Sequence, residues 1–194
     1  TVYKGDTYFG FFSRQALTNQ VGIRDVVPYQ PTATEVSRAR QFAYPQQAPY
    51  PADQMRMIDR IEHFDAEGGP HGLGYIRGTA RVNPEAWFFK AHFYQDPVWP
   101  GSLGLESFIQ LLKVVACERW QGGETARLES MALHQPHHWL YRGQIIPKDH
   151  EVTVSAVVKQ VDDTRKLLTA DGFLIVDGRI IYQMTDFTLR MSDI

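Results

Sequence analysis

The sequence predicts an α+β fold in which a curved antiparallel sheet wraps around one long buried helix. Residues 101–120 form a long helical segment whose apolar side chains cover most of its circumference, as is typical of a helix buried on nearly all sides. Gly122 and Gly123 are expected to end it. The strand-like segments that follow are rich in β-branched and aromatic residues. One helix followed by antiparallel strands is most economically packed as a sheet that curves around the helix.

The other elements follow from local patterns along the chain. Residues 57–64 and 75–82 alternate well enough to predict two strands before the helix. Residues 84–88 start with a proline, which the first turn of a helix tolerates, and they predict a short helical turn. The pair Asp177-Gly178 indicates a tight hairpin between the last two strands. Five strands are expected after the helix, at residues 127–133, 139–145, 152–161, 166–176 and 180–190.

Composition divides the chain into three zones. Residues 1–27 form a lead segment with a strand-like aromatic run and then a short helical-looking piece. Residues 28–52 hold five prolines, which favour extended backbone, so this zone is expected to be an extended linker that lies along a surface; a disordered tether is the alternative. Residues 53–194 are expected to form one compact domain.

The overall composition excludes several functional classes. The 194 residues carry a formal charge of -2 and no basic run, which argues against a nucleic-acid or membrane-surface binder. No apolar run is long enough to span a membrane. Cys117 is the single cysteine, so no internal disulfide is expected and a cytoplasmic location is favoured. The chain does not begin with Met, which indicates a piece of a longer polypeptide.

The segment 87–106 carries the strongest chemical pattern. His92 lies in an aromatic neighbourhood just before a loop that two prolines stiffen. The loop leads to Gly101 and Ser102 at the start of the buried helix, where free N–H groups and the helix dipole suit a developing oxyanion. Glu106 follows in the first turns of the same helix. A carboxylate on a core helix is unusual unless it is hydrogen-bonded or functional.

These residues resemble the hotdog-fold β-hydroxyacyl-thioester dehydratases. The resemblance rests on Ala91-His92-Phe93, on the run Asp96-Pro97-Val98-Trp99-Pro100-Gly101-Ser102-Leu103-Gly104-Leu105-Glu106, and on Gln110. The acid follows the histidine by fourteen positions, as in the family pattern, and the likeness extends over about residues 53–190. This sequence differs from the family pattern at two positions. The family most often has aspartate where Glu106 stands, and it commonly has cysteine where Ser102 stands. Residues 1–52 are similar to the junction between tandem dehydratase modules of polyunsaturated fatty acid synthases.

The resemblance implies a hydro-lyase that converts (3R)-hydroxyacyl chains on acyl carrier protein to trans-2-enoyl thioesters. His92 would take the α-proton, and Glu106 would position or protonate the leaving hydroxyl. The Gly101 N–H would hold the thioester carbonyl. The Val98 carbonyl would fix the tautomer of the imidazole, while Gln110 would hydrogen-bond the acid and Ser102 would be a small polar residue beside the oxyanion glycine. Whether the double bond is also isomerised stays open.

The resemblance also implies partners. The histidine and the acid of one site would come from two hotdogs, either in a homodimer or in a pseudo-dimer with a neighbouring module. An apolar tunnel beside the helix would hold the acyl chain, with Phe93, Trp99 and Phe108 as candidate wall residues. No metal or cofactor is expected beyond the phosphopantetheine of the acyl carrier protein that carries the substrate.

Three other interpretations are open at this point. An acyl-thioesterase could use the same fold, with a positioned water in place of a base aimed at the α-carbon. A degenerate hotdog could dock acyl carrier protein, or complete a pseudo-dimer, without catalysis. His134, His137 and His138 could suggest a metal site, but no cysteine or paired carboxylate joins them, so they are expected to be turn and strand-edge residues.

Overall fold

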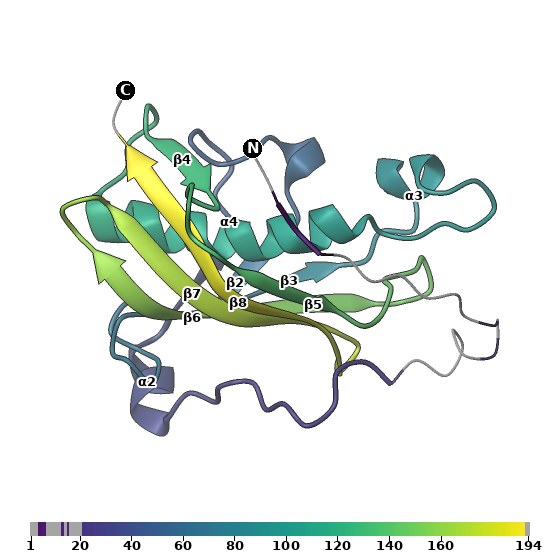
Figure 1. The fold of residues 1–194 in the computed structure, drawn as a ribbon, viewed down its shortest axis with the longest axis horizontal. Helices are drawn as coiled ribbons and strands as arrows, with labels where there is room; N and C mark the ends of the chain where they lie inside the picture. The colour runs from purple at the N-terminus through teal and green to yellow at the C-terminus, as the bar shows by residue number, and fades with distance from the viewer. Residues whose placement is uncertain (1–3, 7–12, 14, 16–20, 193–194) are drawn as a thin grey trace.

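The computed structural model describes residues 4–6, 13, 15 and 21–192 (Figure 1). The aromatic run at 8–12, expected to be strand-like, lies outside these residues. Within the described part of the chain, no helix combines the length and the apolar character needed to cross a membrane.

Among the described residues, eight strands form one antiparallel sheet, which is the body of the protein. Its strand order is β1-β2-β3-β6-β7-β8-β4, and β5 also pairs with β8. The three longest strands, β6, β7 and β8, each contribute several buried residues to the hydrophobic core. The bounds are β1 Arg40–Ala43, β2 Arg60–Asp65, β3 Tyr75–Arg81, β4 Arg127–Ser130, β5 His138–Tyr141, β6 Glu151–Asp162, β7 Leu167–Val176 and β8 Arg179–Ser192.

Helix α4, Gly101–Trp120, has the bounds that its sequence predicts. Most of its side chains are buried, and it runs along the sheet that curves around it (Figure 1). Gly172 on β7 allows this close packing, because a Cβ there would lie 2.3 Å from Phe108 of α4. The predicted hotdog arrangement, a sheet wrapped around one buried helix, is therefore confirmed.

Several boundaries differ from the predicted ones. The sequence predicts that Gly122 and Gly123 end α4, but the left-handed residue that ends the helix is Gln121. The N–H of Gly122 bonds to the carbonyl of Cys117. Strand β4 stops at Ser130, since Met131 has a positive φ of 56°. The short helix α3 spans Trp87–Ala91, a few residues later than expected. The hairpin at Asp177-Gly178 is confirmed, with φ values of 46° and 82° at its two residues.

The proline-rich range 28–52 contains two regular elements. Helix α2, Ala33–Arg38, begins with a capping box between Thr32 and Glu35, and β1 adds an edge strand to β2. The Glu35 carboxylate accepts the N–H of Gly69 in the β2–β3 turn at 2.7 Å. These contacts fix residues 28–52 to the sheet. The proline content of the same range predicts an extended linker. A short 3-10 helix, Asp53–Met55, follows.

Candidate active site

His92 lies at the C-terminal end of α3 and is half-buried. Its Nδ1 atom lies 3.2 Å from the carbonyl oxygen of Val98, and its own carbonyl accepts the Val98 N–H at 2.9 Å. The Phe93 ring lies against the imidazole at a tilt of 30°, with 3.8 Å between ring centroids. When Nδ1 carries the proton and donates it to Val98, Nε2 keeps a lone pair that can accept a proton. The loop thus holds the imidazole in one orientation.

The start of α4 offers N–H groups that the helix does not use. Pro100 precedes the helix, and its carbonyl accepts the N–H groups of Leu103 and Gly104. The N–H groups of Gly101 and Ser102 precede these and have no partner within the helix. They lie at the positive end of the helix dipole, which favours a developing negative charge.

Aromatic side chains that the sequence pattern did not single out border this helix start. A Cβ at Gly101 would lie 2.9 Å from the ring of Tyr141 and 3.3 Å from that of Trp139, so glycine permits their close approach. Tyr182 is fully buried, and its hydroxyl donates to the Gly101 carbonyl at 3.4 Å. Burial raises the pKa of Tyr182 well above its ordinary value, so this hydroxyl stays protonated.

Glu106 lies further along α4, with a side chain that is 25% exposed. Its Oε1 atom accepts a hydrogen bond from Gln110 Nε2 at 3.2 Å, as expected from their spacing of one helical turn. The same Oε1 atom lies 2.7 Å from Nζ of Lys113. Sequence reasoning missed Lys113, although its spacing of seven residues places it on the same face of the helix as Glu106.

Gln110 is itself fixed by the backbone that precedes the first long strands. Its side chain is fully buried, its Oε1 atom accepts the N–H of Met57 at 2.9 Å, and its Nε2 atom donates to the Met55 carbonyl at 2.7 Å. A buried amide with all of these bonds cannot turn freely. Gln110 therefore gives the carboxylate of Glu106 a rigid support.

The structure does not join the two predicted catalytic side chains within one chain. No hydrogen bond or ion pair links His92 to Glu106 among the described residues, and Ser102 is exposed on the first turn of α4. The predicted arrangement, in which each chain supplies one of the two groups, is compatible with this separation and stays a prediction.

The three candidate tunnel residues occupy different environments. Phe93 is 58% exposed, whereas Trp99 is buried against Phe88 and Phe89 of α3. Phe108 is fully buried between α4 and the sheet, beside Phe187. In the isolated chain Phe108 therefore fills the core, and the tunnel lined by these three residues stays a prediction.

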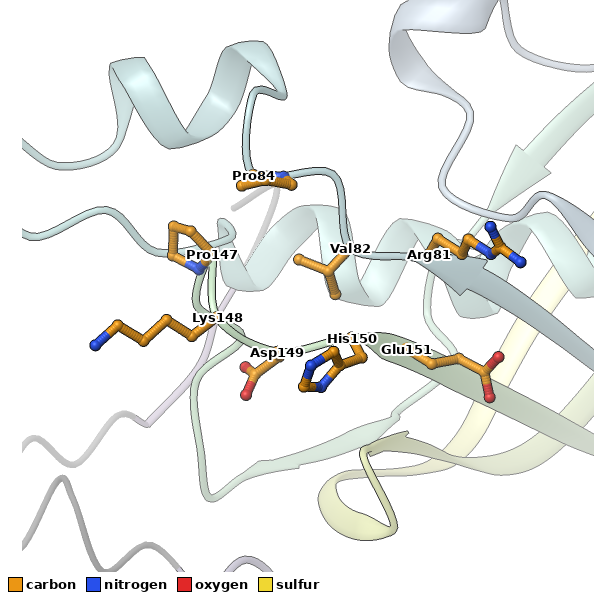
Figure 2. Close-up of a pocket in the computed structure, with 8 residues that line it drawn as sticks. All are labelled: Arg81, Val82, Pro84, Pro147, Lys148, Asp149, His150 and Glu151. Atoms are coloured by element: carbon orange, nitrogen blue, oxygen red, sulfur yellow. The ribbon is translucent and has the colours of Figure 1, made fainter.

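Two surface cavities lie away from these residues. An open pocket of about 500 Å³ lies between the end of β3 and the start of β6, and one of about 190 Å³ lies beside Tyr29 and Phe173. Figure 2 shows that Lys148 of the larger pocket points away from Arg81 and Glu151. Lys148 therefore does not meet Arg81 and Glu151 at a common point.

The surroundings of Cys117, His137 and His138 indicate structural roles for these residues. Burial raises the pKa of the Cys117 thiol, which favours the protonated and unreactive form. Over the described ranges, no group of three or more His, Cys, Asp or Glu side chains is arranged to hold a metal ion. His137 packs against Phe187, and His138 begins the edge strand β5.

Comparison with known proteins places this chain in a family. Residues 50–185 match the FabA-like domain. The chain is 32% identical over 218 aligned residues to one of the polyunsaturated fatty acid synthase subunits of a Thraustochytrium species, an alignment that covers 98% of this chain and 14% of that protein. The chain thus spans about a seventh of the length of this relative.

Two solved structures share weaker similarity with the chain. The dehydratase heterocomplex ApeI:P from Xenorhabdus doucetiae has 11% identity and a TM-score of 0.49, over 84% of this chain and 91% of that one. A mutant of thioesterase PA1618 from Pseudomonas aeruginosa has 14% identity and a TM-score of 0.46, over 70% and 81%. The family match, which covers most of the chain, confirms the resemblance seen in the motif from His92 to Glu106, and the chain belongs to the FabA-like family.

Proposed function

We propose that this chain is a dehydratase that removes water from 3-hydroxyacyl thioesters carried by acyl carrier protein. The observation that carries the proposal is the imidazole of His92, held through Nδ1 by the Val98 carbonyl so that Nε2 is left to act as a base. Membership of the FabA-like family and the similarity to part of a polyunsaturated fatty acid synthase support the same reaction.

In the proposed reaction, Nε2 of His92 takes the proton from the α-carbon of the acyl chain. The electron pair of that C–H bond forms the new double bond, and the bond between the β-carbon and its hydroxyl breaks. The hydroxyl, held by the carboxylate of Glu106, takes the proton back from the imidazolium of His92 and leaves as water. The N–H groups at the start of α4, Gly101 foremost, stabilise the enolate-like thioester oxygen. The product is a trans-2-enoyl thioester.

This elimination involves no net oxidation or reduction, so an acid, a base and oxyanion donors are sufficient for it. The proposal accordingly includes no metal and no redox cofactor. The phosphopantetheine arm of the carrier protein would present the thioester, and it belongs to the substrate.

The proposed active unit is a pair of hotdogs. Trp139, Leu140 and Tyr141 of the edge strand β5 are each 36–37% exposed, and Phe93 and Tyr94 are 58% and 89% exposed. Exposed apolar side chains on an edge strand mark a surface for association with another protein. A second hotdog, either another copy of this chain or a neighbouring module, would cover this surface and bring its Glu106 towards His92.

Product analysis with a 3-hydroxyacyl thioester tests the proposed reaction. The wild-type chain is expected to yield an enoyl thioester, and His92→Ala is expected to lower the rate by about 10²–10⁴-fold while the protein stays folded by circular dichroism. Release of free acid and thiol would instead indicate a thioesterase. Tight binding of acyl carrier protein without turnover of either 3-hydroxy stereoisomer would indicate a non-catalytic docking module.

A further inference from the structure

We infer that Lys113 is a positioning residue that holds Glu106 for the reaction, an inference that rests on the proposed dehydration. Nζ of Lys113 lies 2.7 Å from Oε1 of Glu106, and the two side chains are 16% and 25% exposed. In the described part of the chain, Lys113 has no other ion-pair partner. No family feature named in the motif includes this lysine, which lies seven residues beyond the acid.

The donors around Glu106 all meet one of its two oxygens. Both Gln110 Nε2 and Lys113 Nζ bind Oε1. Among the described residues, Oε2 has no hydrogen-bond or ion-pair partner. This arrangement fixes the side chain through one oxygen and leaves the other available to a substrate hydroxyl.

The lysine also accounts for glutamate at a position where the family most often has aspartate. Seven residues of α-helix rise about 10.5 Å, so the two side chains must extend towards each other along the helix to come within 2.7 Å. An aspartate is one methylene shorter, so its carboxylate would lie farther from the same ammonium group in this geometry. Glu106 and Lys113 therefore form a pair matched in length.

Stability alone is a weak reason for such a pair. Ion pairs with solvent access contribute little to folding, because holding two long side chains in one geometry costs rotamer entropy. A catalytic carboxylate gains more from the same restraint, since the reaction rate depends on its being held close to the productive position. The ion pair thus converts the longer, more mobile glutamate into an oriented carboxylate whose Oε2 atom can hold the substrate hydroxyl.

A double-mutant cycle tests this inference, with kcat and KM measured on a 3-hydroxyacyl thioester. Lys113→Met is expected to lower kcat by about 10–100-fold with little change in KM and in the thermal midpoint, and Lys113→Arg is expected to restore part of the loss. In a Glu106→Asp background, which shortens the acid, Lys113→Met is expected to have almost no further effect, because the pair is already broken.

Lys159→Met is the matched control. Lys159 also forms partly exposed ion pairs, at 2.7 Å to Asp186 and 3.1 Å to Asp171, but on the sheet away from α4. Its replacement is expected to leave kcat unchanged. A folded Lys113→Met variant with wild-type kcat, or effects of Glu106→Asp and Lys113→Met that simply multiply, would overturn the inference while the proposed dehydration stands. A wild-type chain that fails to dehydrate the thioester would overturn both.

Discussion

Two glutamates of this protein, Glu35 and Glu106, are held in opposite ways. Glu35 is 7% exposed, and both of its oxygens accept hydrogen bonds. Its donors are the Tyr29 hydroxyl, the backbone and side chain of Thr32, and the N–H of Gly69. Glu106 is bound at Oε1, whereas Oε2 has no partner among the described residues.

The contrast separates a carboxylate that holds the fold from one that can act on a substrate. Hydrogen bonds from Thr32 and Tyr29 lower the pKa of Glu35 to about 2, so this group stays ionised and has no capacity left for another partner. The side chain of Glu106 is fixed through Oε1, and its Oε2 atom has no partner among the described residues. The number of occupied oxygens, rather than burial, distinguishes the two roles.

The largest expected effect is on catalysis at Glu106. Glu106→Gln removes the carboxylate that holds the leaving hydroxyl, and the dehydration rate is expected to fall by about 10²–10⁴-fold. The free energy of unfolding is expected to change by less than about 1 kcal/mol, because the ion pair with Lys113 has access to solvent. Steady-state kinetics and urea unfolding of the same preparation measure both quantities. A large loss of stability with retained activity would reverse the roles assigned to the two glutamates.

Glu35→Gln is expected to show the opposite pattern, with lower stability and an unchanged kcat in the folded protein. An amide at this position places N–H groups against the N–H donors of Thr32 and Gly69, which leaves buried donors without acceptors. Glu67→Gln is the matched control, since the Glu67 side chain is 81% exposed. The midpoint of urea unfolding is expected to fall for Glu35→Gln and to stay near wild type for Glu67→Gln.

The stabilising effect of Glu35 is also expected to depend on pH. The pKa of its carboxyl is lowered from 4.5 to about 2 in the folded chain, so the folded state favours the ionised form. This stability is fully present above the unfolded value and is lost as the pH falls from about 4.5 towards 2. The difference in urea midpoint between wild type and Glu35→Gln is expected to shrink on acidification. A difference that is constant from pH 6 to pH 3 would contradict this assignment.

Local patterns predicted much of the fold. The bounds of α4 follow from apolar spacing and a proline-glycine start, and the hairpin follows from Asp177-Gly178, because these features depend on residues close in sequence. The same holds for the contact between Glu106 and Gln110, which one helical turn brings together.

Most of the features that the sequence did not predict depend on contacts between distant residues. Helix α2 is fixed to the sheet by Arg38, which binds Asp65 twenty-seven residues later, and no local pattern reports that pair. The rings of Trp139 and Tyr141 reach Gly101 because β5 pairs with β8. Lys113 could have been found from helical spacing, but the motif of the family ends before it.

Mixing two inactive variants tests the central claim most directly, namely that His92 of one hotdog acts together with Glu106 of another. His92→Ala and Glu106→Gln are each expected to be inactive alone. After unfolding and refolding together, random pairing makes half of the dimers mixed, and each mixed dimer has one intact site of two, so about a quarter of wild-type dehydration is expected. A mixture that stays as inactive as either variant, although mixed dimers are detected by mass spectrometry, would contradict the account.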